Sequence, residues 1–458
     1  MRYTPNPNAV VKEMLTSVGL FTLDELFSDV PNVIKEKCVL PESYGMSELS
    51  VRRQLDELAF LNETSDDCAI FLGAGCYDHY IPAAVSQLIA RSEFYTAYTP
   101  YQPEISQGIL QSIFEYQTLI CNLTGMDIAN ASLYCGGSAL AQACQVAAEV
   151  SKKRIILLPK TLHPDYAQIV KTYSISDQME IRFIPEKNGQ IDLELLPAYL
   201  SSEVAGVVIQ YPNFYGNLEA VADIIQMVRE KTDALVIMSV DPIVLSMLKS
   251  PGEWGADIAV GDAQVLGNSM SFGGPHLGFM AVTHKLLRKI PGRLVGQTVD
   301  ENGKRSFVLT LQAREQHIRR EKANSNICSN QALNALTVLM YLTFVGPFGL
   351  KQAALSSHRM AQYAHSLFAE AGFTFPHNVP FFREFVVNVA NPHFVNKKLL
   401  EYGIIGGYEL EKGLLFAFTE KRTRDEIDEL VELMTTFSQE ISSTNKEQLN
   451  NELKGENE

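Results

Sequence analysis

The chain has 458 residues, 46% of them hydrophobic and 20% charged, which suits a globular protein of two or three domains. Its formal net charge of -15, from 38 Lys and Arg against 53 Asp and Glu, argues against general binding to nucleic acids or anionic membranes. The seven cysteines form no CxxC pair, which favours reduced thiols in a cytoplasmic protein. The sequence has no secretory signal pattern at its start and no run of about 18 apolar residues, so no membrane span is expected.

The first 65 residues predict a helical N-terminal arm. The stretches VKEMLTSVGL and TLDELFSDV carry apolar residues at three- and four-residue steps, which is the period of an amphipathic helix. The segment looks like an arm attached to the rest of the chain more than an independent domain.

Residues 66–325 predict a large α/β domain. Short apolar runs alternate with helical patterns there, and nearly continuous apolar runs are typical of strands buried on both faces. The runs are RIILLP (154–159), EIRFIP (180–185), AGVVIQYP (205–212), ALVIMSVD (234–241) and ADIAVGD (256–262). This alternation predicts a mostly parallel sheet covered by helices, with ligands bound at the carboxyl ends of the strands.

Residues 326–442 predict a smaller α+β domain. Two helical stretches, QALNALTVLMYLTF and KQAALSSHRMAQYAHSLFAEAG, come before two short strands, FREFVVNV and GLLFAFT. The stretch TRDEIDELVELMTTF predicts a last helix. The tail 443–458 has little apolar content and is expected to be disordered.

A glycine-rich turn, YCGGSALAQACQVAAEV (134–150), leads directly into an alanine-rich helix. The free N–H groups at such a helix start can seat a phosphate, which makes Gly136, Gly137 and Ser138 candidate cofactor-binding residues. The alternative is an ordinary helix cap whose glycines allow close packing against the sheet. The turn alone does not decide between these two interpretations.

The strand end at Asp241 is a second candidate for cofactor binding. A carboxylate there can face a ring nitrogen, as in pyridoxal-phosphate enzymes, although a turn Asp before Pro242 is the alternative. In an enzyme of this layout the Schiff-base lysine follows roughly 20–30 residues later. Gln264 and Val265 stand in that slot, and the sequence has no lysine between Lys249 and Lys285. The layout of a covalent-cofactor site is therefore present without the residue that bonds the cofactor.

The segment FYTAYTPYQPEISQGILQ (94–111) predicts an interaction loop or an active-site loop. Its prolines stiffen the backbone, and its tyrosines offer rigid apolar faces with hydroxyl ends. A structural loop that fills the core is the alternative. The histidines lack partners at metal-ligand spacing, so no metal site is expected, and His163 favours a structural role.

Long stretches of the sequence resemble the P-protein family of the glycine cleavage system, in particular the alpha chains of its two-subunit form. The resemblance covers nearly the whole chain, and TAYTPYQPEISQG is its most specific part. The other matching stretches are FLGAGCYDHYIP (71–82), NLTGMDIANASLY (122–134), QYPNF-G (210–216), GADIAVGDAQ (255–264), FGGPHLGF (272–279), PGRLVGQTVDENGKRSFVLTLQAREQHIRREKANSNICSNQALNAL (291–336), PFFREFVV (380–387) and IIGGYEL (404–410).

The resemblance implies an aspartate-aminotransferase-like fold of type I, an enzyme that uses pyridoxal phosphate, and a beta chain that carries the cofactor and its lysine. The alpha chain would bind no cofactor covalently and would hold only a vestigial pocket. The pair, expected as a cytoplasmic α2β2 assembly, would decarboxylate glycine and pass the aminomethyl group to the lipoyl arm of H-protein.

On the same resemblance, the alpha chain would contribute an aromatic wall to the shared pocket. The expected pocket or interface residues are Tyr95, Tyr98, Tyr101, Gln102, Glu104 and His79. The chain departs from the family pattern at Cys135, Ser138 and Gln142, where the family has Asp, Thr and Glu. The alternative function is a non-catalytic regulatory or scaffolding paralogue of the same fold.

Overall fold

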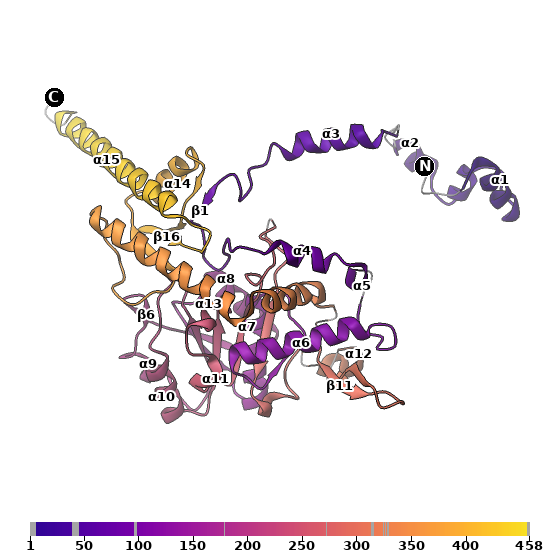
Figure 1. Ribbon diagram of the computed structural model, residues 1–458, viewed down its shortest axis with the longest axis horizontal. Helices are drawn as coiled ribbons and strands as arrows, with labels where there is room; N and C mark the ends of the chain where they lie inside the picture. Colours follow the sequence, from indigo (N-terminus) through magenta and orange to yellow (C-terminus); the bar gives the residue numbers. More distant parts are fainter. Residues whose placement is uncertain are drawn as a thin grey trace. The chain divides into compact units, whose positions relative to one another are not determined.

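The computed structural model describes residues 6–38, 45–95, 99–177, 179–271, 273–312, 316–323, 325, 327 and 329–455. It comprises two units, Met1–Glu63 and Thr64–Glu458 (Figure 1). The first unit covers the stretch that the sequence predicts to be an arm.

Unit 1 is built from short helices that form almost no core. Its elements are α1 (Asn8–Ser17), the 3-10 helix η1 (Asp24–Phe27), α2 (Asn32–Lys37) and α3 (Glu48–Ala59). Among the described residues of this unit, Leu15 is the one side chain that is buried. The predicted stretch VKEMLTSVGL overlaps α1, whereas TLDELFSDV forms only the four-residue 3-10 helix η1. The apolar side chains of both are left largely uncovered within the unit.

Unit 2 is organised around a seven-stranded sheet with the order β2-β10-β9-β8-β7-β3-β4. The strands are β2 (Ile128–Ala129), β3 (Ile155–Pro159), β4 (Glu180–Ile184), β7 (Val204–Tyr211), β8 (Leu235–Val240), β9 (Ile258–Asp262) and β10 (Gly278–Val282). All five strands predicted from apolar runs are present and pair in parallel, whereas β10 is antiparallel to β9 and β2. The predicted mostly parallel sheet is confirmed.

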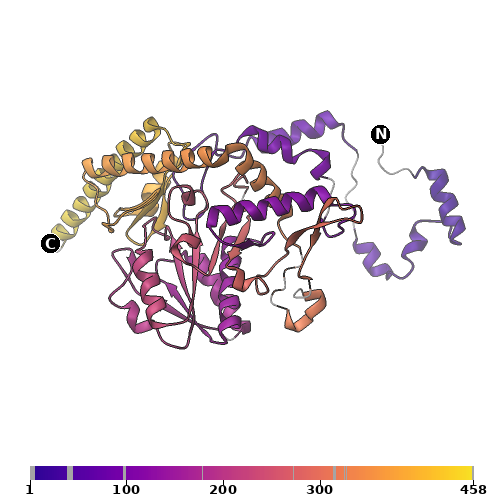
Figure 2. The ribbon, with the colours of Figure 1, turned by 60° about the horizontal axis from the view of Figure 1, so that its bottom comes forward.

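Helices cover both faces of this sheet (Figure 2). Successive side chains of a strand point to opposite faces, so Val236 and Met238 of β8 enter one core and Ile237 enters the other. The first core contains residues of α6 (Gln107–Thr124), α10 (Val221–Lys231) and α13 (Ala332–Glu370), and the second those of α7 (Gly136–Ser151) and α8 (Pro164–Asp177). Burial on both faces explains why the strands are continuously apolar.

The C-terminal part of unit 2 contains a small antiparallel sheet of order β13-β16-β15. Its elements are β13 (Glu384–Asn388), α14 (Pro392–Leu400), β14 (Ile404–Ile405), β15 (Tyr408–Leu410), β16 (Gly413–Ala417) and α15 (Arg424–Gly455). The strand β1 (Ala69–Ile70) pairs with β14, so residues assigned to the large domain by sequence contact the small one instead. Helix α15 runs to Gly455, within the segment 443–458 that is expected to be disordered. The disorder of this segment and the other domain boundaries stay predictions.

The two helices predicted for residues 331–372 both lie within α13, and a kink at Gly346 separates them. Gly346 has φ 61° and ψ 179° inside it, and Pro347 follows, so the helical hydrogen bonds are interrupted there. Among the described residues α13 is the one helix long and apolar enough to cross a membrane. Its side chains contribute to the large core through Leu336 and Leu339 and to the small core through Phe368, as expected for a helix inside a globular domain.

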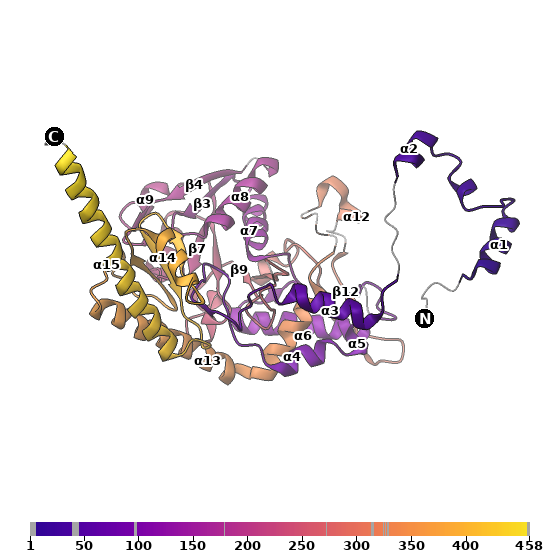
Figure 3. The same ribbon diagram turned by 90° about the horizontal axis from the view of Figure 1, so that it is seen from above.

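Short elements complete unit 2 (Figure 3). They are α4 (Ala83–Ile89), α5 (Ser92–Tyr95), β5 (Glu186–Lys187), β6 (Gln190–Ile191), α9 (Leu196–Tyr199), η2 (Val244–Ser246), α11 (Pro251–Trp254), η3 (His284–Leu286), β11 (Val295–Val299), β12 (Arg305–Leu309), α12 (Gln316–Arg319) and η5 (Arg320–Lys322). The strands β11 and β12 pair as an antiparallel hairpin that packs against α6.

Candidate functional site: a closed pocket at the strand ends

Two carboxylates stand at the carboxyl edge of the parallel sheet. Asp241 directly follows β8, and Asp262 is the last residue of β9, so parallel neighbours bring both to one edge. Helix α7 begins beside them at Gly136. This is the edge at which the sequence predicted a ligand site.

The start of α7 is held by Asp262. The Gly136 N–H donates to Asp262 Oδ2 at 3.0 Å, and the Gln264 N–H donates to Asp262 Oδ1 at 2.9 Å. His276 Nδ1 lies 3.0 Å from Asp262 Oδ2. Burial raises the pKa of the Asp262 carboxyl, but the bonds from His276, Gly136 and Gln264 outweigh it and leave this pKa below its ordinary value.

The glycines at this helix start are required by close packing. A Cβ at Gly136 would lie 2.2 Å from the Tyr166 hydroxyl oxygen, and a Cβ at Gly137 would lie 2.5 Å from Ile169 Cδ1. Tyr166 and Ile169 belong to α8, so this helix presses directly on the start of α7. The geometry therefore supports the close-packing interpretation of the glycines.

Ser138 completes the cap of α7 from inside the helix. The Cys135 N–H donates to Ser138 Oγ at 3.0 Å, and the Ser138 N–H donates to Cys135 Sγ at 3.4 Å. The helix-capping residue is therefore Cys135, where the family pattern has Asp. A thiol is a weak acceptor, so at this helix start the stronger anionic partner is Asp262.

Asp241 is bound by a buried arginine from the small domain. Its Oδ2 accepts a hydrogen bond from Arg383 Nη2, and its Oδ1 accepts one from the Ile243 N–H at 2.9 Å. The Arg383 guanidinium lies 3.5 Å from the centre of the Tyr77 ring, and its side chain is 3% exposed. The carboxylate that would face a cofactor ring nitrogen is thus already paired within the chain.

His79 extends this network away from Asp241. Arg383 Nη1 lies 2.7 Å from His79 Nε2, and His79 Nδ1 lies 2.7 Å from Glu420 Oε2. A guanidinium only donates, so Nε2 accepts and Nδ1 carries the proton that is donated to Glu420. Burial lowers the pKa of His79, which is consistent with this neutral tautomer.

The residue in the lysine slot points into the protein. Gln264 is 3% exposed, its amide nitrogen donates to the Asn268 carbonyl, and its Oε1 accepts from Cys76 Sγ at 3.5 Å. Val265 is also buried. Neither side chain can form an imine.

Little space remains between these groups. The cavity at this edge has a volume of about 60 Å³, room for a few water molecules, whereas small-molecule sites span roughly 300–1,000 Å³. Its lining includes Tyr77, His163, Tyr166, Asp241, Asp262 and Arg383. The residues present do not fit pyridoxal phosphate: the slot lacks a lysine, both anchoring groups are paired internally, and the space is too small.

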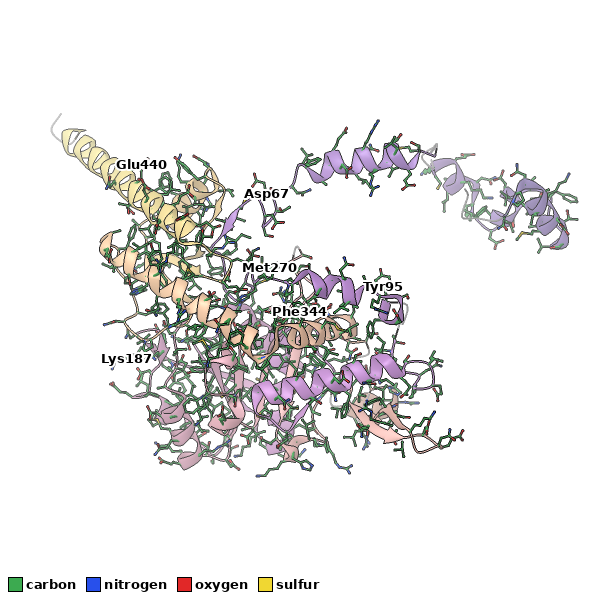
Figure 4. All side chains as sticks on the ribbon, viewed as in Figure 1. Asp67, Tyr95, Lys187, Met270, Phe344 and Glu440 are labelled. Atoms are coloured by element: carbon green, nitrogen blue, oxygen red, sulfur yellow. The ribbon has the colours of Figure 1, made fainter. Side chains whose placement is uncertain are left out.

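The predicted aromatic loop lies elsewhere in unit 2. Tyr95 lies at the end of α5 (Figure 4) and is 70% exposed. Gln102 and Glu104 are also exposed. Tyr101 is half-buried with its ring 4.5 Å from the Arg293 guanidinium, and Tyr98 lies outside the described residues. Of the predicted wall residues that the structure describes, only His79 lies in the Asp241 network.

The loop is anchored to the hairpin rather than to the cavity. Gln107 Nε2 donates to the carbonyls of Pro103 and Phe307, at 2.7 and 2.9 Å, and the Phe307 N–H donates back to Gln107 Oε1. The exposed positions of Tyr95, Gln102 and Glu104 count against the alternative of a loop that only fills the core.

The buried carboxyl of Glu384, at the same edge, is expected to make the stability of the fold depend on pH. Its buried Oε1 accepts from the Ala74 N–H at 2.8 Å, and burial, opposed by Arg383, raises the pKa of the carboxyl to about 7. Between about pH 4.5 and 7 the folded chain keeps a proton that the unfolded chain has released, so the free energy of unfolding falls as the pH rises through this window.

Glu384→Gln should remove that fall, because the amide keeps the size and cannot ionise. The free energy of unfolding of the variant, relative to the native chain, should be greater at pH 8 than at pH 5 by about 2.5 kcal/mol. Urea unfolding at both pH values measures it, with the exposed Glu203→Gln as the matched control. If the free energies of unfolding of the variant and the native chain differ by the same amount at pH 5 and pH 8, Glu384 does not titrate in this window.

The fold, with a strand-end aspartate and a glycine-rich helix start at one sheet edge, is that of pyridoxal-phosphate-dependent enzymes of fold type I. A NifS-like protein aligns at a TM-score of 0.60 with 13% identity, covering 81% of this chain and 99% of that one. The sphingosine-1-phosphate lyase of Burkholderia pseudomallei aligns at 0.64 with 12% identity, covering 90% and 96%. These likenesses show the fold alone.

The chain belongs to the family of the glycine cleavage system P-protein, whose model matches residues 1–434. It is 56% identical over 434 residues to the probable glycine dehydrogenase (decarboxylating) subunit 1 of Syntrophomonas wolfei, covering 95% of this chain and 99% of that protein. The same-named protein of Carboxydothermus hydrogenoformans is 53% identical with the same coverage. A crystal structure of glycine decarboxylase (P-protein) in inhibitor-bound form has a TM-score of 0.87 and 41% identity, covering 95% and 100%.

Of the charged residues at this edge, Asp241 is predicted from the sequence, whereas Asp262 and Arg383 are not. Asp262 lies at the end of a predicted strand, just as Asp241 does. Its place in GDAQ is therefore a signal by which Asp262 could have been identified as a site residue. Arg383 stands beside Glu384 in FFREFVV, where two charges inside an apolar strand signal buried pairing. What the sequence does not show is that Arg383 meets an aspartate 142 positions earlier.

Proposed function

We propose that this chain is the alpha subunit of a two-subunit glycine dehydrogenase (decarboxylating), and that it acts only when paired with a beta chain that binds pyridoxal phosphate. The pair removes the carboxylate of glycine as carbon dioxide and transfers the aminomethyl group to the lipoyl disulfide of H-protein. The assignment of the cofactor to the beta chain is supported by the closed pocket of this chain, which has Gln264 and Val265 in the lysine slot. The scaffolding or regulatory alternative is not favoured, because the relatives carry an enzyme subunit name.

Two exposed surfaces support the need for a partner. Unit 1 by itself leaves most of its large apolar side chains uncovered, and uncovered apolar area of this extent is typical of subunit interfaces. The residues are Val10, Met14, Val18, Phe21, Leu23, Leu26, Phe27, Val33, Ile34, Met46, Leu49, Val51, Leu55, Leu58, Phe60 and Leu61. We propose that the beta chain covers them in a cytoplasmic α2β2 assembly.

The second surface is the aromatic loop. We propose that Tyr95, Tyr98, Tyr101, Gln102 and Glu104 border the pocket shared with the beta chain and help to admit the lipoyl arm. The rings would keep water away from the reacting carboxylate, and a water-poor pocket favours decarboxylation because the carboxylate loses stabilising solvent.

Co-purification followed by an absorbance scan tests the division of labour. The purified alpha chain should be colourless, whereas the alpha–beta complex should absorb where a pyridoxal imine does. Borohydride reduction and peptide mapping should place the label on a beta-chain lysine. A pyridoxal imine on one lysine of this chain, or a stable alpha monomer that ignores an added beta chain, would refute the proposal.

A further inference from the structure

Two groups at the closed pocket, the Asp241 carboxylate and the start of α7, are each paired with a charged side chain of the same chain. Enzymes of this fold hold pyridoxal phosphate through a lysine, a carboxylate facing the ring nitrogen and a helix start facing the phosphate. The lysine is absent here, but the carboxylate of Asp241 and the start of α7 remain. Left unpaired, a buried carboxylate and a row of helical N–H groups would both destabilise the fold.

At the ring-nitrogen end the partner is a flat, delocalised cation. The Arg383 guanidinium pairs with Asp241 while lying face-on to Tyr77, 3.5 Å from the ring centre. Its second bond, to His79 Nε2 at 2.7 Å, fixes its plane. A planar cation that donates a hydrogen bond to Asp241 has the charge and the shape of a protonated pyridine ring.

At the phosphate end the partner is an anion. The carboxylate of Asp262 accepts from the Gly136 N–H at 3.0 Å, the position relative to a helix start that a phosphate oxygen takes. His276, 3.0 Å away, supports the negative charge of Asp262. One chain therefore carries a cation for the ring site and an anion for the phosphate site, with only about 60 Å³ of cavity at this edge.

We propose that Arg383 and Asp262 are built-in replacements for the two charged ends of pyridoxal phosphate, which hold the lysine-free pocket folded and closed. The pocket is thereby a structural centre of the chain and is unable to take the cofactor even without a covalent bond. This inference does not depend on the partner or on glycine as substrate, because it concerns the residues of this chain alone.

Removal of each replacement should create a site for a small molecule of matching charge. The full chain with Arg383→Ala should lose roughly 5 °C or more in melting temperature, because Asp241 is left as an unpaired buried charge. Millimolar 4-aminopyridine, a flat ring with a cationic N–H at neutral pH, should restore part of that loss. Tetramethylammonium, which is neither flat nor a donor, should not.

The phosphate end has a parallel test. Asp262→Gly frees the Gly136 N–H, so inorganic phosphate should raise the melting temperature of this variant above the effect of sodium chloride at matched ionic strength. Two variants serve as matched controls and should gain nothing from the probes. They are Arg422→Ala, which removes a buried arginine paired with Asp78, and Asp257→Gly, which removes an aspartate paired with Arg229.

Two further measurements keep the proposal open to refutation if these variants fold poorly. The double variant Arg383→Met with Asp241→Asn removes both charges and should recover most of the melting temperature lost by Arg383→Met alone. Pyridoxine 5′-phosphate, which has the ring and phosphate but no aldehyde to label surface lysines, should leave the melting temperature of the native chain unchanged. Stabilisation of the native chain by this compound, no recovery in the double variant, or folded single variants that do not respond to their probes would overturn the proposal.

Discussion

Tyr95→Ala is expected to cut the turnover of the reconstituted alpha–beta pair by roughly tenfold or more, as the loss of a positioned group at a shared pocket does. The melting temperature of the alpha chain should stay within about 1 °C of the native value, because the side chain is 70% exposed and its truncation leaves no cavity. Tyr95→Phe separates the two parts of the side chain, since it keeps the ring and removes the hydroxyl. The readout is labelled carbon dioxide exchanged into glycine in the presence of H-protein, with melting measured on the same samples.

Two further variants show whether the effect belongs to the loop. Glu104→Gln keeps size and removes charge, so a similar loss of turnover would assign an electrostatic role to this carboxylate. Tyr402→Ala truncates another exposed tyrosine in the small domain, and Figures 3 and 4 show that domain at the opposite end of unit 2 from α5. It should exchange carbon dioxide normally. If Tyr95→Ala and Glu104→Gln also exchange normally, the loop is not part of the site and the residue assignments fall, although the family assignment stands.

The strands of the large sheet could be predicted from the sequence because their pattern has a single physical cause. A strand covered on both faces must be apolar at every position, as Val236, Ile237 and Met238 are, and such runs are hard to confuse with surface structure. The kink of α13 at Gly346 was also signalled, since the sequence suggested two helices there. The pairing of β1 with β14 was not, because a two-residue strand carries no periodic signal and its partner lies more than 300 positions away.

The site was harder to predict because its chemistry depends on tertiary contacts. Asp241 was identified from its place after a strand, and Gln264 from its distance along the chain. The charged groups of the network come from other elements: Arg383, which pairs with Asp241, precedes β13, and Glu420, which pairs with His79, follows β16. The residue Cys135 was overlooked as the cap of α7 because cysteine is not among the usual capping residues.

The central claim is that this chain completes an active enzyme only together with a beta chain. Omission of the alpha chain should therefore remove glycine decarboxylation completely, a larger effect than that of any single substitution. The physical reason lies in both chains. The alpha chain cannot act alone, because it lacks a lysine at the slot and has its anchor groups already paired. On the proposed function, the pocket of the beta chain in turn lacks the wall that the aromatic loop of the alpha chain would supply.

The most direct measurement is the exchange of labelled carbon dioxide into the carboxyl group of glycine, with lipoylated H-protein, by each chain alone and by the pair. The account predicts no exchange above background by the alpha chain alone, and exchange that rises as alpha is titrated into a fixed amount of beta until the two are equimolar. Exchange by the alpha chain alone would contradict the absence of a working cofactor site. A stable alpha–beta complex that exchanges nothing would instead mark this chain as a scaffold.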